Sequence, residues 1–359
     1  MTDDPKYTDT EEYQKEIAEQ YKRRVVKFDN EEIINSLKIL GFDNIKVSDL
    51  TTTTAGNMNA TYLTPNLVVK VNKGERPNYL SNKMVSDRLA GKSLVVKVLA
   101  YDYFDKTPFE ILVMERAPGD SLLNDIFEFS EDEVKDLFRQ VLTVINRMCE
   151  IKFDSFGWMN LEGKKFFPSF AEFLTYEFKI NAQKVRDEKL CKPEDVDKVE
   201  AYFLKHVSVF NTSEKPTIMH RDLHMGNFLH EGTKLTAIID FDWSMKGPKC
   251  GNLVSLLGFI DNPSQYTEGS EYFAKYKGKN FRYLLPVLKE ELKDIFADKD
   301  LIRKLNLLFI SDGIKWIGEN WSAQWNADMI KGLLENEMPE NDEGLNNTYP
   351  AKVLNSFTL

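Results

Sequence analysis

The chain has 359 residues, of which 42% are hydrophobic, so it is long enough to bury a sizeable core in one large domain or two lobes. Its formal net charge of −10 argues against a nucleic-acid-binding protein, because such proteins need a basic face to neutralise phosphates. The cysteines form neither a metal-ligand pair nor a disulfide framework, and we expect them to be thiols in a reducing compartment: Cys149, Cys191 and Cys250.

The N-terminal residues, MTDDPKYTDTEEYQKE, are acidic and polar, which does not fit a signal or transit peptide. No apolar run approaches the roughly 18 residues that a membrane-spanning helix needs. We therefore expect a soluble cytoplasmic protein without a membrane partner. The sequence does not indicate an oligomeric state.

Residues 1–44 are predicted to form a helical extension. Within it, residues 9–27 show a charged helical pattern, and residues 30–40 carry apolar residues at helical spacing between an Asn cap and Gly41. Residues 45–117 then change to short β-rich runs with one helical segment at 79–89. The runs are IKVSDL, TYLTPNLVVKVN, LVVKVLAYDY and FEILVMER. This pattern predicts a small sheet that carries one helix.

Residues 118–359 are predicted to be mostly helical, ending in a polar and irregular tail, ENEMPENDEGLNN. Helical periodicity covers residues 130–151, 169–187, 193–209, 252–262 and 284–335. The predicted fold class is therefore α+β and bilobal. A small β-sheet lobe is joined through a hinge at residues 114–119 to a larger helical lobe.

Two polar stretches interrupt the helical part. In IMHRDLHMGNFL (218–229), apolar residues anchor a loop in which Asp222 and Asn227 stand five residues apart. In TAIIDFDW (236–243), Asp240 follows a β-branched run, so its carboxylate is expected at a strand end. The intervening residues fit two short strands joined by a turn at the letters EGT. Such a hairpin would bring both potential ligands to one end.

These side chains suit phosphoryl transfer, in which a protein mainly positions groups and neutralises charge. An Asp on a rigid loop can accept a proton from a hydroxyl, and the oxygens of Asn and Asp are hard ligands that suit Mg²⁺. The structural alternative is that the polar residues only cap a turn and satisfy a buried loop.

The pattern H-x-D-x-x-x-x-N followed by I-I-D-F-D resembles the signature of the aminoglycoside phosphotransferase and choline kinase superfamily, which shares the protein-kinase-like fold. The resemblance implies a kinase that transfers a phosphoryl group from ATP, or from GTP, to a hydroxyl of a small acceptor, with a cationic acceptor as one option. It makes Asp222 the base or orienting acceptor, and Asn227 and Asp240 the Mg²⁺ ligands. His220 belongs to the catalytic group, where we expect it to brace the loop.

Lys70, between two valines in NLVVKVN, matches the strand lysine that holds the α- and β-phosphates and belongs to both the catalytic and the nucleotide-binding groups. Gly56 and Asn59 in AGNMNATYL resemble the loop that covers the nucleotide. In ILVMERAPG, the resemblance pairs the Glu115 carbonyl and the Ala117 amide with adenine.

Three positions depart from the family pattern. Asn82 stands where an acid should pair with Lys70, which leaves Asp87, another acid or a weaker amide contact for that role. Arg221 replaces the usual small residue, in the form found in protein kinases. Asn252 lies where a second acid is often found. By position, Asp242 is expected to be structural and to bond nearby backbone, and His224 is expected to brace the loop.

Two alternative functions stay open. The H-R-D and D-F-D triplets suggest a protein kinase, although the chain after Asp240 runs almost directly into an apolar helix and leaves no room for a long activation segment. Asn82 suggests a catalytically inactive nucleotide-binding protein. A P-loop enzyme is excluded, because Ser86 stands where the motif that ends in GKS at 91–93 needs its first glycine.

The acceptor site is expected to be built by residues 150–210 and 260–340, which hold most of the aromatic residues. The segment SFGWMN…FFPSFAEFL resembles the helical insert that walls the acceptor pocket in this family. A wall for an amine is also conceivable, since aromatic faces and carboxylates both suit a cation. Its hypothetical members are Trp321, Trp325, Asp312, Glu319 and Asp328.

Overall fold

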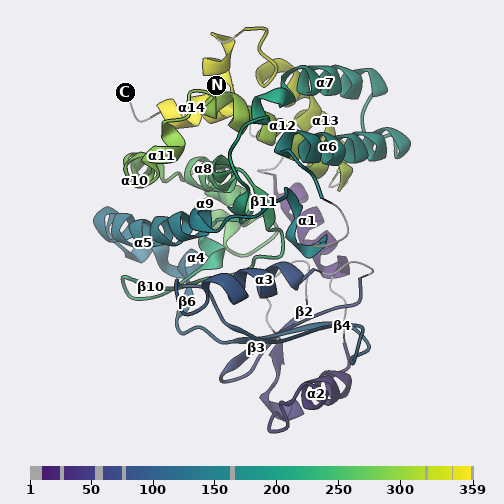
Figure 1. Cartoon of the computed structure of the whole chain (residues 1–359), viewed down its shortest axis with the longest axis vertical. Coiled ribbons are helices and arrows are strands. Elements are labelled where there is room, and N and C mark those ends of the chain that lie inside the picture. Colours follow the sequence, from purple (N-terminus) through teal and green to yellow (C-terminus); the bar gives the residue numbers. More distant parts are fainter. Residues whose placement is uncertain are drawn as a thin grey trace.

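The computed structural model describes residues 10–24, 28–52, 60–74, 78–161, 166–319, 322–341 and 343–356. A small sheet-based lobe and a larger helical lobe are stacked along the long axis of the molecule (Figure 1). The predicted α+β class with two lobes is confirmed. The predicted boundaries at residues 44 and 117 stay predictions.

The small lobe is built on a five-stranded antiparallel sheet with the strand order β1-β2-β3-β5-β4. Its strands are β1 (Thr51–Thr52), β2 (Ala60–Leu63), β3 (Leu67–Asn72), β4 (Val98–Tyr103) and β5 (Glu110–Glu115). The run IKVSDL does not begin a strand, which corrects the prediction. Asp49 accepts a hydrogen bond from the Lys46 backbone N–H at 2.9 Å and closes a 3₁₀ helix, η2 (Val47–Asp49). This local bond competes with the sheet ladder.

Helices cover both faces of this sheet (Figure 1). On one face, α2 (Asn30–Ile39) packs through Ile33 and Leu37 against Val69 and Val71 of β3. Side chains alternate along a strand, so Lys70 points to the opposite face, where α3 (Leu80–Leu89) lies. The period of two in VVKV thus directs a lysine toward the junction of the lobes.

The two N-terminal helices contact different lobes. The cap of α2 is Asp29 rather than the expected Asn, because the Asp29 carboxylate accepts from the Glu31 N–H at 2.9 Å. In contrast, α1 (Glu11–Arg24) packs on the large lobe, where the Tyr13 hydroxyl donates to Glu268 at 3.0 Å. Gly269, with φ +71°, allows this close approach, since a Cβ there would lie 2.9 Å from the Ala18 nitrogen.

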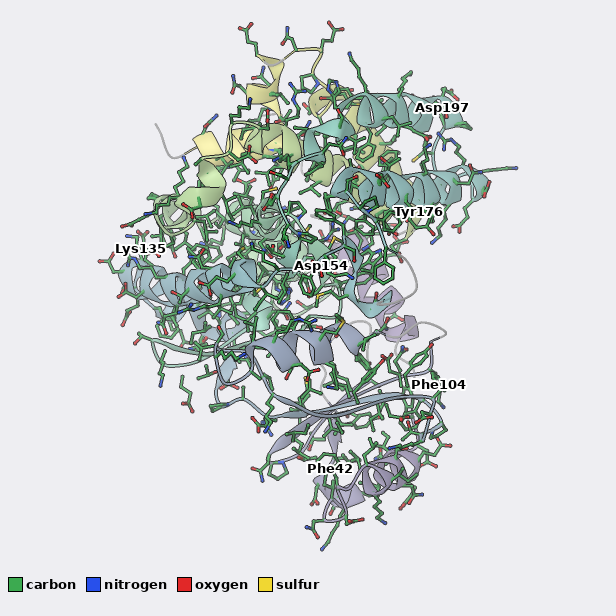
Figure 2. The ribbon with its side chains drawn as sticks, in the orientation of Figure 1. Phe42, Phe104, Lys135, Asp154, Tyr176 and Asp197 are labelled. Atoms are coloured by element: carbon green, nitrogen blue, oxygen red, sulfur yellow. The ribbon has the colours of Figure 1, made fainter. Side chains whose placement is uncertain are left out.

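The large lobe surrounds one continuous hydrophobic core, and charged side chains such as those of Asp154 and Asp197 cover its surface (Figure 2). The predicted helices are present, although the region 284–335 is divided among four of them. The tail also contains a 3₁₀ helix, η10 (Gly344–Asn347), which the sequence did not indicate. The helices are α4 (Leu122–Asp125), α5 (Glu131–Glu150), α6 (Phe170–Asp187), α7 (Pro193–His206), α8 (Leu253–Asp261), α9 (Phe273–Tyr276), α10 (Leu285–Glu291), α11 (Lys293–Phe296), α12 (Leu301–Gly318), α13 (Ala323–Asn336) and α14 (Tyr349–Asn355). Over the part of the chain that the structure describes, no helix has the length and apolar composition needed to cross a membrane.

Two small sheets carry the two polar stretches. The predicted hairpin is confirmed as β9 (Phe228–Glu231) and β10 (Lys234–Ile238), which pair antiparallel with β6 (Asp120–Ser121) at the edge. The second sheet pairs β11 (Met245–Gly247) with β7 (Gly157–Trp158) and β8 (Thr217–Met219). The first polar loop therefore joins β8 to β9, and the second joins β10 to β11.

A buried carboxylate near the C-terminus predicts a pH-dependent stability. Glu337 is 3% exposed, and burial raises the pKa of its carboxyl from 4.5 to about 7 despite hydrogen bonds from the Tyr349 N–H. Between these two pH values the folded protein binds this proton more tightly than the unfolded chain, so stability falls as the pH rises. Glu337→Gln cannot ionise. From pH 5 to pH 8, its free energy of unfolding should rise relative to the wild type by up to about 3 kcal/mol.

Urea unfolding at several pH values measures this difference. Glu340→Gln, at an exposed position close by, is the matched control and should differ from the wild type by the same amount at every pH. A pH-independent difference for Glu337→Gln would contradict the assignment.

Candidate active site

His220 joins the two polar loops and is fully buried. Its Nε2 lies 3.0 Å from the Ile239 carbonyl oxygen, so Nε2 carries the proton, because a carbonyl only accepts. Its Nδ1 accepts a hydrogen bond from the Asp222 N–H at 3.3 Å. Burial lowers the pKa of His220, which favours this neutral tautomer. These contacts fit the bracing role expected for His220.

Asn252 explains one departure from the family pattern. Its Oδ1 accepts from the His220 N–H at 2.9 Å, and its Nδ2 donates to the Ile218 carbonyl at 3.1 Å. An ionised carboxylate only accepts, so an Asp here would leave the Ile218 carbonyl without this donor. The amide therefore fits a buried position that requires both a donor and an acceptor.

Asp222 and Asn227 are joined directly across the first loop. The Asn227 Nδ2 donates to the Asp222 carbonyl oxygen at 2.8 Å and to Oδ2 at 3.0 Å. His224 accepts from the Gly226 N–H through Nδ1, so its Nε2 faces the Asp222 Oδ1 at 3.5 Å. Burial alone would raise the pKa of Asp222, but attraction to His224 and these hydrogen bonds outweigh it and lower the pKa to about 2. Asp222 is thus a stable anion at neutral pH.

Asp240 lies beside Asn227 at the open end of the hairpin. The N–H of Ile239, the residue before Asp240, donates to the Asn227 carbonyl at 3.0 Å. Asp240 has φ +65° and Arg221 has φ +75°, both in the left-handed region. Non-glycine residues in such regions cost on the order of 1–3 kcal/mol each, and they cluster at active sites. The structure therefore joins the side chains of Asp222 and Asn227 and places Asp240 one residue beyond the backbone bond between Ile239 and Asn227.

Lys70 reaches this group from the other lobe. Its Nζ lies 2.8 Å from the Asp240 Oδ1 and 3.0 Å from the Asp242 Oδ2. Burial by itself lowers the pKa of Lys70, but the two carboxylates raise it overall, so the ammonium stays charged. Asp87 is not its partner, because Asp87 forms an exposed ion pair with Lys83 on α3.

Asp242 takes the role that the family pattern gives to an acid on α3. Its carboxylate is buried, whereas we expected a structural residue that bonds nearby backbone. Asn82 donates to the Asp242 Oδ1 through Nδ2 and accepts from the Phe241 N–H at 3.1 Å through Oδ1. Burial and the charge of Asp240 raise the pKa of Asp242, so the contacts from Lys70 and Asn82 help to keep it ionised. The second carboxylate of D-F-D is visible in the sequence, but no pattern there indicated that it would reach Lys70.

Residues 50–286 match the model of a protein family described as the phosphotransferase enzyme family. The chain belongs to this family. Its enzymatic class is therefore that of a kinase-type phosphotransferase, as predicted. No protein among curated sequences gives a significant match.

Solved structures with a similar fold include aminoglycoside phosphotransferases. A thermostable mutant of APH(4)-Ia, in a ternary complex with AMP-PNP and hygromycin B, is 14% identical with a TM-score of 0.58 over 84% of this chain and 98% of that chain. ADP-bound APH(2'')-Ib is 17% identical with a TM-score of 0.58 over 91% and 99%. The GDP and kanamycin complex of APH(2")-IIia is 18% identical with a TM-score of 0.57 over 84% and 97%. These similarities confirm the predicted kinase-like fold.

The nucleotide contacts predicted for this phosphotransferase are placed only in part. Glu115 is the last residue of β5 and Ala117 follows it in the connection to the large lobe, so their pairing with adenine stays a prediction. Gly56 and Asn59 lie outside the described residues. A small pocket between the lobes adjoins the site and is lined by residues that include Val98, Met114, Ile238, Ile239 and Asp240.

Two carboxylates of the hypothetical amine-binding wall already have partners within the protein. Asp312 is ion-paired with Arg221, and the exposed Asp328 accepts a hydrogen bond from Gln324 on α13 at 2.9 Å. Trp325 packs against the large core, and Trp321 lies outside the described residues. The carboxylate closest to the catalytic loop is therefore already neutralised by an arginine of that loop.

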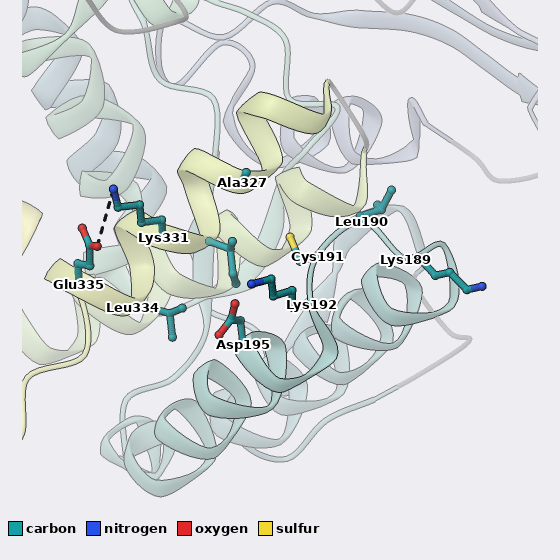
Figure 3. Close-up of a pocket in the computed structure, with 10 residues that line it drawn as sticks. Lys189, Leu190, Cys191, Lys192, Asp195, Ala327, Lys331, Leu334 and Glu335 are labelled. Atoms are coloured by element: carbon teal, nitrogen blue, oxygen red, sulfur yellow. Dashed lines mark ion pairs between the residues drawn. The ribbon is translucent and has the colours of Figure 1, made fainter. Parts of the chain in front are cut away.

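A cavity of about 590 Å³ lies elsewhere in the large lobe, between the α6–α7 connection and α13 (Figure 3). Its lining includes Lys189, Cys191 and Lys331 but none of the predicted site residues. Burial raises the pKa of the Cys191 thiol, so this cysteine is not an activated nucleophile.

Proposed function

We propose that this enzyme transfers the γ-phosphoryl group of ATP, or of GTP, to a hydroxyl group of a small molecule. The observation that carries the proposal is that Asp222 and Asn227 are in contact at the end of the hairpin where the chain also places Asp240, which Lys70 reaches from the other lobe. The nucleotide and antibiotic complexes of the structurally similar enzymes support it: AMP-PNP with hygromycin B, and GDP with kanamycin.

Asn227 and Asp240 would hold a Mg²⁺ ion. The amide nitrogen of Asn227 is engaged with Asp222, so its Oδ1 is the atom offered to a metal, and Asp240 adds a carboxylate oxygen. No cluster of three or more His, Cys, Asp or Glu side chains suits a metal among the residues that the structure describes. Mg²⁺ does not require one, because it is commonly bound by one or two carboxylates together with phosphates and water. When bound, it neutralises charge on the phosphates.

Asp222 would accept the hydrogen bond of the acceptor hydroxyl. A carboxylate with a pKa of about 2 is a weak base at neutral pH, so its main contribution is to orient the hydroxyl oxygen toward the phosphorus. The proton would move to Asp222 as the new bond to phosphorus forms and the bond from the γ-phosphorus to the bridging oxygen breaks, with ADP, or GDP, as the leaving group. Lys70, held in place by Asp242, would hold the α- and β-phosphates next to Asp240.

A small acceptor is favoured over a protein substrate by the chain that follows Asp240. After a short loop the chain enters β11, then a 3₁₀ helix, η7 (Lys249–Asn252), and then α8. This path leaves no long segment on which a peptide could dock. Arg221, the residue that resembles protein kinases, is bound to Asp312 of α12.

Asp240→Ala tests the proposal. In a thermal-shift assay with ATP, the wild type should show a rise in Tm that depends on Mg²⁺, and the variant should lose that dependence because it lacks the carboxylate ligand. Asp87→Ala, in an exposed ion pair, is the matched control and should behave like the wild type. Circular dichroism checks that the variants are folded.

A measurement of enzymatic turnover completes the test of the proposed function. ATP consumption is measured with aminoglycosides, choline, ethanolamine, homoserine, methylthioribose, sugar amines and macrolides as acceptors. Equal Mg²⁺-dependent binding by Asp240→Ala and the wild type would contradict the metal assignment. A wild type that binds Mg·ATP yet shows neither transfer nor slow hydrolysis would indicate the inactive nucleotide-binding alternative.

A further inference from the structure

Lys315 on α12 occupies an aromatic cage next to the proposed active site. Its Nζ lies 3.9 Å from the ring centroid of Trp243, 5.3 Å from that of Trp158 and 5.4 Å from that of Trp316. Trp243 directly follows Asp242, so the cage is continuous with the loop that carries the proposed metal ligand. Trp158 comes from β7, which pairs with β11 beyond that loop.

The ammonium of Lys315 has no direct hydrogen-bonding or ion-pair partner among the described residues. Among the described residues, no carboxylate or carbonyl oxygen forms a hydrogen bond or ion pair with it. Asp312, one helical turn earlier on α12, is ion-paired with Arg221. Burial, followed by repulsion from Arg221, lowers the pKa of Lys315 to about 8. The acidic groups that act against this shift are Asp312 of α12, Glu319 at the C-terminal cap of α12, and Glu177 of α6.

The position of Lys315 relates it to the acceptor rather than to the nucleotide. Arg221 is adjacent to Asp222 in the chain and reaches α12 at Asp312. Residues three apart on a helix share a face, so Lys315 follows Asp312 on the side that meets the catalytic loop. The tryptophan faces that could have received a cationic acceptor are occupied by this lysine.

We propose that Lys315 recognises an anionic group of the acceptor, so that the acceptor is an alcohol that also carries a carboxylate or a similar oxyanion. This inference rests on the proposed phosphotransferase function and specifies its substrate class. A half-buried ammonium that no carboxylate contacts directly is unfavourable until a ligand supplies such a contact. At Lys315, the repulsion from Arg221 exceeds the attraction to the Asp312 carboxylate with which Arg221 is paired.

Matched acceptors of different charge test the inference. The hydroxy acids are glycerate, threonate and gluconate; the neutral counterparts are glycerol, threitol and glucose; the amines are serinol and glucosamine. Binding to the enzyme with saturating Mg·AMP-PNP is followed by tryptophan fluorescence, since Lys315 lies among three tryptophans. Phosphorylation is followed by ATP consumption. At least one hydroxy acid should bind and react better than its neutral and amine counterparts.

The variant Lys315→Met removes the charge but keeps the length and apolar contacts of the side chain. It should raise KM for the hydroxy acid by about tenfold to a hundredfold, as expected for a lost hydrogen bond to a charged group, with kcat nearly unchanged. Lys315→Arg should restore most of the affinity. The matched control is Lys331→Met, on the exposed surface of α13, which should have no effect.

A pH profile separates recognition from a purely structural role. In the wild type, affinity for the hydroxy acid should fall as the pH rises through about 8, because Lys315 then loses its charge. In Lys315→Arg this fall should disappear from that range, since an arginine stays protonated. A lysine that only fills the cage would produce neither the fall nor its displacement.

Three results would overturn the inference: preference for the amines, an unchanged KM in Lys315→Met, or no binding of any hydroxy acid by the wild type. The Mg²⁺-dependent shift of Tm with ATP distinguishes the causes. If that shift is present and neutral or cationic acceptors are phosphorylated, only the inference about Lys315 fails. If neither nucleotide binding nor transfer is found, the proposed function fails as well.

Discussion

Asp222→Asn is expected to lower kcat by about 10²–10⁴-fold while the affinity for Mg·ATP stays within about twofold of the wild type. The substitution keeps the size of the side chain and an oxygen that can accept from the Asn227 amide, which now donates to the Asp222 Oδ2 at 3.0 Å. It removes the negative charge that would orient the acceptor hydroxyl and take its proton. The groups proposed to bind the nucleotide, Lys70 and Asp240 among them, are ion-paired with each other and are left in place by the substitution.

Two measurements separate phosphoryl transfer from nucleotide binding. Steady-state transfer with the acceptor found in the screen gives kcat, and titration calorimetry with Mg·AMP-PNP gives nucleotide affinity. Asp87→Asn makes the same chemical change at an exposed ion pair and should retain full activity. A wild-type kcat in Asp222→Asn would show that Asp222 takes no part in the reaction. A loss of nucleotide affinity in parallel with the loss of kcat would indicate that the loop has collapsed instead.

The small lobe illustrates how much of the fold the sequence could predict. The alternation in VVKV places Val69 and Val71 in the core under α2 and Lys70 on the other face, and this depends only on strand geometry. The run IKVSDL has equally strand-like composition but forms a 3₁₀ helix, because the Asp49 side chain bonds the Lys46 backbone. Such a competing local bond depends on the rotamer of one short side chain, which composition does not determine.

In the site, too, contacts between residues close in the chain could be predicted from the sequence, whereas contacts between distant residues could not. Asn227 and Asp240 are joined by one hairpin, so their spacing along the chain was enough to predict that they lie at the same end of it. Lys70 and Asp242 are 172 residues apart, and no sequence pattern specified that this acid, rather than one on α3, would hold the lysine. The family resemblance pointed to the position of Asn82, where this chain has an amide that supports Asp242 instead.

The charge of an acceptor site was even less accessible from the sequence. Asp312 belonged to a hypothetical wall for an amine, but its partner Arg221 lies 91 residues away in the chain. Lys315 was one of many lysines until the structure placed it against Trp243. Whether a carboxylate is available to a ligand depends on which cation it already contacts, and that is a property of tertiary packing.

Lys70→Met is expected to lower the free energy of unfolding by about 3–5 kcal/mol at pH 7.5 without Mg²⁺, because it leaves a buried carboxylate without its cation. The main penalty falls on Asp242, whose side chain is 8% exposed, rather than on Asp240, which is 36% exposed. The cost should shrink toward acid pH, where protonation removes the uncompensated charge. Urea unfolding of the wild type and the variant across this pH range measures it.

A double-mutant cycle shows whether the cost is that of an unpaired charge. Adding Asp242→Asn to Lys70→Met removes the orphaned carboxylate, so the double variant should lose clearly less stability than the sum of the two single variants. Lys83→Met with Asp87→Asn is the matched cycle on an exposed pair of the same lobe, and its coupling should stay below about 0.5 kcal/mol. Additive losses at Lys70 and Asp242 would contradict the pairing. Strong coupling there would instead establish that the lysine and the second Asp of D-F-D act as one unit that links the two lobes.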